Sequence, residues 1–76
     1  MPGIHNLKPL KVIKAFERAG WTSLGQKGSH VVLTKEGNPN ILSIPVHKGR
    51  PIKQGLLLNQ IKAAGLTKEE FLEYYK

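Results

Sequence analysis

Apolar residues near the start of the chain recur at the spacing of one helix face. Pro9 suits the first position of such a helix because its missing N–H needs no partner there, and Gly20 suits the residue just past the end. The pattern therefore predicts an amphipathic helix between these residues, after a lead-in over residues 1–7. The residues of the apolar stripe are Val12, Ile13, Phe16 and Ala19.

The middle of the chain changes to the period of a β-strand. The segment Ser29 to Lys35 is rich in β-branched residues and is the strongest strand prediction of the sequence. Because side chains alternate between the two faces of a strand, Val31 and Leu33 share one face. If these two face the core, His30 faces outward, where a large substrate can reach it.

Two weaker strands are expected beside this one. The first covers residues 21–27, with Trp21 and Leu24 as its apolar members and Gly25 at a bulge. The second covers residues 41–44 and returns as an antiparallel hairpin. Its predicted turn is Glu36 to Asn40, its core-facing residues are Leu42 and Ile44, and its end is Pro45.

Two helices are expected after a loop over residues 46–53. The longer helix covers residues 54–64 and stops at Gly65, and a short one follows Thr67, which has the spacing of a capping box with Glu70. The buried residues expected in these helices are Leu57, Ile61, Ala64, Phe71, Leu72 and Tyr75. The chain is therefore predicted to be one α+β domain over residues 1–76, with three antiparallel strands.

The charge of the chain suits a polyanionic partner. Lys and Arg number 12 against 5 Asp and Glu, a net charge of +7, and most of the acidic residues come after residue 63. Such a field attracts nucleic acid, although it also serves simply to keep a small domain soluble. The absence of cysteine excludes disulfides and thiolate catalysis, and the spacing of the three histidines does not suggest a metal site.

Neither a membrane span nor a secretion signal is predicted. No apolar run approaches the roughly 20 residues that a spanning helix needs, and the first residues lack the apolar region of a signal peptide. A cytoplasmic location is therefore the expectation.

The segment Gln26 to His30 is the candidate for chemistry on a phosphate. Histidine has an ordinary pKa of about 6.5, so an imidazole accepts or donates a proton readily near neutral pH. Lys27 would hold a phosphate, Ser29 adds a hydroxyl, and Gly28 lets the backbone approach a ligand closely. The alternative is that His30 is an ordinary half-exposed strand residue.

A second group of cations precedes the helix predicted over residues 54–64. Because free N–H groups and the helix dipole attract anions to a helix start, these cations form a candidate phosphate site. They are Lys48, Arg50 and Lys53. Another basic stripe, formed by Lys11, Lys14 and Arg18, is expected to be an ordinary solvated helix face.

From about Lys8 to Tyr75 the chain resembles the HicA toxins of bacterial and archaeal toxin–antitoxin pairs. The segments that carry the resemblance keep a characteristic order and spacing along the chain. They are Ala19-Gly20-Trp21, Gln26-Lys27-Gly28-Ser29-His30, Ile44-Pro45-Val46-His47, Ile52 with Gly55 and Leu57, and Ala64-Gly65-Leu66-Thr67. The resemblance implies a double-stranded-RNA-binding-like α-β-β-β-α fold, with helices on one face of the sheet.

The resemblance also implies an activity and a partner. The activity is metal-independent endonucleolytic cleavage of mRNA (an mRNA interferase) without a cofactor, and the histidine of the Gly-Ser-His segment, here His30, is the implied catalytic residue. The partner is a HicB-like antitoxin. Three residues depart from the usual pattern: Gln54 replaces a common proline, and Leu58 and Gln60 stand where a basic and an apolar residue are usual.

Combining the residues with the resemblance, we expect His30 to act as general base or acid on RNA. The residues expected to contact RNA are Lys27, Ser29, Lys48, Arg50 and Lys53. His47 is a candidate for a second proton-transfer group, and Leu58 would be an apolar anchor for the antitoxin if it is exposed. The alternatives are a module that binds structured RNA without cutting it and an adaptor whose basic face binds an acidic protein.

Overall fold

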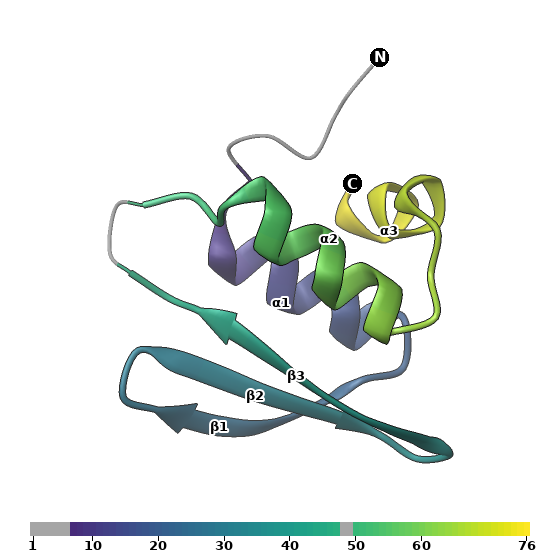
Figure 1. Cartoon of the computed structure of the whole chain (residues 1–76), viewed down its shortest axis with the longest axis horizontal. Helices are drawn as coiled ribbons and strands as arrows, with labels where there is room; N and C mark the ends of the chain where they lie inside the picture. The colour runs from purple at the N-terminus through teal and green to yellow at the C-terminus, as the bar shows by residue number, and fades with distance from the viewer. Residues whose placement is uncertain (1–6, 48–49) are drawn as a thin grey trace.

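Six elements follow one another along the chain in the order α-β-β-β-α-α (Figure 1). They are α1 (Pro9–Arg18), β1 (Thr22–Lys27), β2 (His30–Lys35), β3 (Asn38–Pro45), α2 (Gln54–Ala63) and α3 (Lys68–Tyr75). The structure is a computed structural model that describes residues 7–47 and 50–76. The expected α+β arrangement, including the short extra helix near the C-terminus, is confirmed.

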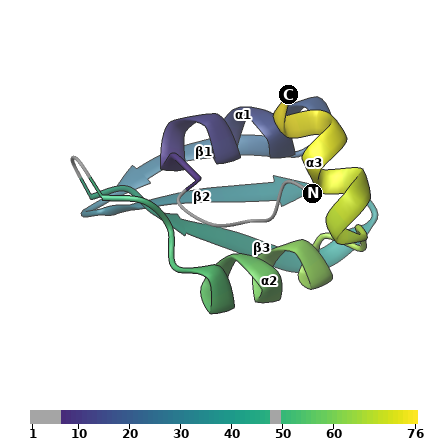
Figure 2. The same cartoon turned by 90° about the horizontal axis from the view of Figure 1, so that it is seen from above.

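The three strands form one antiparallel sheet in the order β1-β2-β3. All three helices lie on the same side of this sheet, with α1 and α2 along it and α3 across the end of α1 (Figures 1 and 2). The other face, which we call the open face, is covered by none of these helices. A sheet with one covered face must place its apolar side chains by strict alternation.

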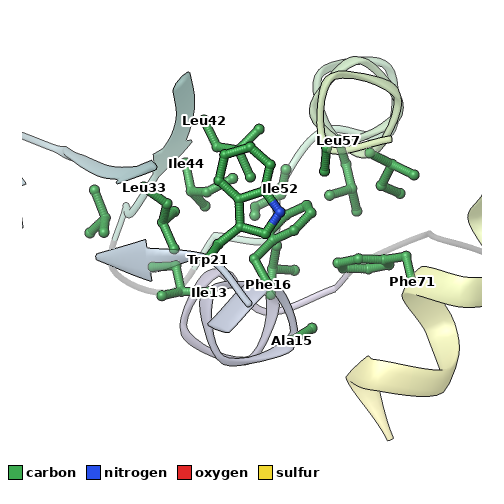
Figure 3. Close-up of a cluster of buried hydrophobic side chains, with 14 of the residues drawn as sticks. Ile13, Ala15, Phe16, Trp21, Leu33, Leu42, Ile44, Ile52, Leu57 and Phe71 are labelled. Carbon is green, nitrogen blue, oxygen red and sulfur yellow. The ribbon is translucent and has the colours of Figure 1, made fainter. Parts of the chain in front are cut away.

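The core lies between the sheet and the helices. β2 and β3 contribute alternate residues, so the predictions that Val31, Leu33, Leu42 and Ile44 face inward are confirmed. Among the residues that α1 and the later helices add, Phe16 and Phe71 are fully buried, with ring centroids 4.9 Å apart (Figure 3). The buried helix residues are Val12, Ile13, Ala15, Phe16, Leu57, Ile61 and Phe71, and Ala64 is buried just after α2. Ala19, predicted on the stripe, is only partly buried.

The end of α1 places Trp21 in the core. Gly20 adopts a positive φ of 102°, and the amide of Trp21 donates to the carbonyl of Phe16, 3.0 Å away. This is the Schellman closure of a helix, in which a residue without a Cβ takes the left-handed position. The chain turns sharply there and buries the indole among the residues drawn in Figure 3.

The prediction for β1 is wrong at its start. Trp21 precedes the strand, which begins at Thr22, and Leu24, the other apolar residue of this segment, is exposed. The bulge expected at Gly25 is observed as a register shift between Ser23 and Gly25. Ser23 is the partner of the buried Leu33 and lies on the core side, so alternation places Leu24 on the other side of the strand.

β3 begins at Asn38, three residues before its predicted start, so the turn holds only Glu36 and Gly37. Pro39 is tolerated because β3 is an edge strand, where a missing N–H breaks no ladder bond. Gln60 Oε1 accepts a hydrogen bond from the outward amide of Ser43 at 3.1 Å. Asn38 Oδ1 accepts one from the amide of Asn40 at 2.8 Å. This edge therefore has few free donors.

α3 is tied to α1 at its C-terminal end and capped at its start. Arg18 Nη1 donates to the carbonyls of Tyr74 and Lys76, each at 2.8 Å. The predicted capping box is confirmed, because Thr67 Oγ1 accepts from the amide of Glu70 while the Glu70 carboxylate accepts from the amide of Thr67. The helix is therefore an integral part of the domain.

Candidate functional site

The turn between β1 and β2 presents the segment that was singled out for chemistry. Gly28 and Ser29 form a two-residue turn between Lys27 and His30, which are paired across the two strands. Gly28 has a φ of 59°, as the first position of type I′ and II′ hairpin turns requires. The side-chain amide of Gln26 donates to the carbonyl of Gly28 at 2.8 Å and so braces the turn.

His30 is exposed and lies on the open face, as predicted. Its neighbour Val31 is buried, and alternation turns the imidazole to the other side of β2. The Ser29 hydroxyl oxygen lies 3.4 Å from His30 Nδ1. The imidazole is therefore open to a large ligand and has a hydroxyl beside one ring nitrogen.

A row of three residues crosses the sheet at His30. Its partner in β1 is Lys27 and its partner in β3 is Pro45. Residues directly opposite one another share a face, so this row sets a cation on one side of the imidazole and a proline on the other. Beyond it the amide of Val46 donates to the carbonyl of Ser29 at 2.6 Å, and His47 follows as an exposed residue.

The second cation group approaches the same end of the molecule. Figures 1 and 2 both place the β1–β2 turn, the end of β3 and the start of α2 toward this end. Arg50 and Lys53 are exposed there, and Lys48 lies outside the described residues. Within the described ranges the ion pair found joins Glu73 and Lys76, so neither Arg50 nor Lys53 is paired with a carboxylate there.

The start of α2 is open to an anion. Lys53 is its N-cap residue and offers no side-chain acceptor to the first amides, and the first turn contains no acidic residue. The start of α3 differs from that of α2, because the Thr67 side chain accepts a hydrogen bond from a first-turn amide and two glutamates lie in that turn. Unsatisfied amides and the helix dipole favour a negative ligand at α2.

The structure brings some of the residues predicted for the site next to His30 and places others apart from it. Lys27 and Ser29 accompany His30 within one hairpin, whereas Arg50 and Lys53 share its end of the domain without a hydrogen bond to it in the described part of the chain. The bracing role of Gln26 was not predicted, because a contact between its side chain and a turn carbonyl leaves no sequence pattern.

No helix of the described residues is long and apolar enough to span a membrane. Nor do three histidine, aspartate or glutamate side chains gather as metal ligands would in residues 7–47 and 50–76. The arrangement instead offers an imidazole, a hydroxyl and several cations on an accessible surface. These groups suit proton transfer at a phosphate ester.

The comparison with protein families gives one match, to the model described as HicA toxin of bacterial toxin-antitoxin, over residues 11–66. The matched range includes the hairpin, the row at His30 and the start of α2, and it ends before α3. The search of curated proteins found no match.

Proposed function

Because the chain belongs to the HicA family of toxins from bacterial toxin–antitoxin systems, we propose that it is an endoribonuclease that cleaves mRNA with His30 as the catalytic residue. The observation that carries this proposal is the position of His30. An exposed imidazole stands on the open face, in a row with Lys27 and beside the Ser29 hydroxyl. RNA needs such a site to be accessible, since the substrate is longer than the domain.

RNA carries its own nucleophile, so few protein groups are required. His30 accepts the proton of the ribose 2′-hydroxyl, and the 2′-oxygen then attacks the adjacent phosphorus. The bond from phosphorus to the 5′-oxygen breaks, and that oxygen takes a proton from a second donor or from water. The products are a 2′,3′-cyclic phosphate and a 5′-hydroxyl end. His47 is the candidate for the second donor, because it is exposed just beyond the partner of His30.

The cations hold the phosphates and stabilise the charge that develops on them. Lys27 serves the scissile phosphate, since it is the strand partner of His30. Ser29 contacts the same phosphate or orients the imidazole. Arg50 and Lys53, with Lys48 of the same loop, hold neighbouring phosphates together with the uncapped start of α2.

Incubation of the purified chain with labelled RNA in EDTA tests the activity. Cleavage with cyclic-phosphate ends is expected, because the proposed steps use only protein groups and the ribose hydroxyl. A stable shifted complex without cleavage would instead support an RNA-binding module. An acidic protein that displaces RNA without any cleavage would favour the adaptor.

Replacement of Arg50 and Lys53 by glutamine is expected to weaken RNA binding and to flatten its salt dependence. For single strands each phosphate contact contributes about 0.7 to the slope of log affinity against log salt, so two lost contacts reduce the slope by about 1.4. Fluorescence anisotropy at several salt concentrations measures this. The matched control replaces Lys14 and Lys62, which are also exposed and lie on other surfaces. Equal slopes for both variants would show that the loop does not hold phosphates.

The family implies a HicB-type antitoxin as partner, and we propose that this protein inhibits the toxin by covering His30. An exposed nuclease site needs such control in its own cell. A partner with acidic residues near the site would use the positive field that also attracts RNA.

A further inference from the structure

One peptide group before α1 links two parts of the chain that are far apart in the sequence. The carbonyl of Leu7 accepts a hydrogen bond from the amide of Ile52 at 3.1 Å. The amide of Lys8, which belongs to the same peptide group, donates to the hydroxyl of Tyr75 at 3.2 Å. We call this group the bridging peptide, because it is bonded to α3 on one side and to the segment before α2 on the other.

The segment on one side of the bridging peptide carries two of the proposed phosphate contacts. We call residues 50–53 the cation segment, since the exposed side chains of Arg50 and Lys53 stand at its two ends. Pro51 has no N–H, and the amide of Arg50 bonds to a carbonyl only three residues back. Among the residues that the structure describes, the amide of Ile52 therefore makes the one backbone hydrogen bond from this segment to a distant part of the chain.

The middle of the cation segment is anchored in the core. Ile52 is 4% exposed and belongs to the buried cluster of Figure 3. α2 follows the segment directly, with Leu57 fully buried and Leu58, considered from the sequence as an exposed anchor, partly buried against the core. Because Arg50 and Lys53 flank Ile52, the orientation of the backbone at Ile52 decides where both charged side chains begin.

The geometry of a peptide group lets one end control the other. The group is planar and rigid, and its N–H and C=O point in opposite directions. The Tyr75 hydroxyl therefore holds the plane from one side, and the carbonyl on the other side holds the Ile52 amide. Hydrogen bonds in such a chain also polarise one another, so each strengthens the next.

The Tyr75 ring has supports of its own. Its centroid lies 6.1 Å from that of the Phe71 ring, and Lys11 Nζ lies 5.4 Å from it on one face. The helix that carries it is held to α1 by the two hydrogen bonds of Arg18. The hydroxyl thus has a fixed position, and its removal alone leaves these other contacts in place.

We propose that Tyr75 is a positioning residue of the RNA site, whose hydroxyl orients Arg50 and Lys53 through the bridging peptide. This inference rests on the proposed function, in which the two cations hold phosphates. An ordered segment loses less conformational freedom when RNA binds, so the hydroxyl raises the affinity without contacting RNA. The residues that form the bridge lie outside the range matched to the family.

Tyr75→Phe tests the link, since it removes the hydroxyl and keeps the ring. RNA affinity measured by fluorescence anisotropy is expected to fall about 2–10-fold, the effect of one neutral hydrogen bond, and KM for cleavage is expected to rise by a similar factor. kcat is expected to stay at the wild-type value, because His30 and Lys27 belong to the β1–β2 hairpin. Tyr74→Phe is the matched control, because Tyr74 is the neighbouring tyrosine and is 37% exposed.

Amide hydrogen exchange followed by NMR tests the link without RNA. In Tyr75→Phe the Ile52 amide is expected to exchange about 2–10-fold faster than in the wild type, because its acceptor peptide has lost a support. The amide of Leu33, on the central strand β2, is expected to keep its rate. Equal acceleration of both amides would indicate a general loss of stability and would overturn the positioning role, as would an unchanged rate at Ile52.

A double-variant comparison shows whether Tyr75 acts through the cation segment. In a protein that already carries Arg50→Gln and Lys53→Gln, Tyr75→Phe is expected to cause no further loss of RNA affinity. Equal losses in both backgrounds, an unchanged affinity of the single variant, or the same loss in Tyr74→Phe would overturn the inference. A wild type that binds RNA but cleaves none would overturn the proposed nuclease instead, and the affinities would still decide the role of Tyr75.

Discussion

Replacement of His30 by alanine is expected to lower the rate of RNA cleavage by about 10²–10⁴-fold while RNA binding persists. The change removes the proposed proton-transfer group and leaves every cation in place. It also leaves the core intact, because the imidazole is exposed and points away from the helices. Single-turnover cleavage of labelled RNA measures the rate, and anisotropy measures the affinity.

His47→Ala is the comparison for this experiment, since His47 is a second exposed histidine and comes two residues after Pro45, the strand partner of His30. A smaller loss there would identify His47 as the second proton donor, and no loss would assign that role to water. A His30→Ala protein that cleaves RNA at the normal rate would remove His30 from the mechanism. Growth after induced expression gives the same comparison in cells.

Replacement of Phe71 by alanine is expected to destabilise the domain by about 3–5 kcal/mol. A domain of 76 residues has a total stability of about 4–11 kcal/mol, so this loss would leave little of the folded state. Phe71 is fully buried and its ring lies 4.9 Å from that of Phe16. α3 lies beyond the range matched to the family, yet it completes the core.

Urea unfolding followed by circular dichroism measures this loss as a shift of the midpoint. Tyr74→Ala is the control within the same helix, because Tyr74 is 37% exposed and the change is expected to cost about 1 kcal/mol or less. Equal midpoints for the Phe71→Ala variant and the wild type would mean that α3 is dispensable for the fold.

Local sequence patterns were sufficient to predict the helices and strands in which apolar side chains recur at a regular spacing. The alternation around Val31 and Leu33 fixed both the core face of β2 and the outward position of His30. The ends of α1 and α2 followed from Gly20 and Gly65, which both adopt a positive φ. In these cases the residue and its immediate neighbours determine the conformation, so no distant contact has to be known.

The errors occur where a distant contact outweighs local composition. Asn38 and Asn40 have the composition of a turn, but their side chains donate to the carbonyl of Ala63 on α2 and β3 extends through them. Leu24 has an apolar side chain but is exposed, because it follows Ser23, whose strand partner Leu33 faces the core.

The placement of the cations was predictable only in part. The position of Lys27 beside His30 was predictable, because the two-residue turn of the hairpin pairs these residues across the two strands. Arg50 and Lys53 belong to the loop after β3, which runs antiparallel to β2 and so ends beside His30. The distance of these cations from the imidazole therefore depends on how the whole sheet is paired.

The two borders of the sheet have unequal capacities to add another strand. Along β3, Pro39 and Pro45 have no N–H, and the amides of Asn40 and Ser43 are already bonded to side chains. Strand-by-strand growth at a sheet border requires a continuous series of free donors and acceptors. Addition of a strand along β3 is thus disfavoured. Fibres that grow strand by strand need both borders of each sheet, so a blocked border along β3 protects crowded copies of this domain from polymerising in that way.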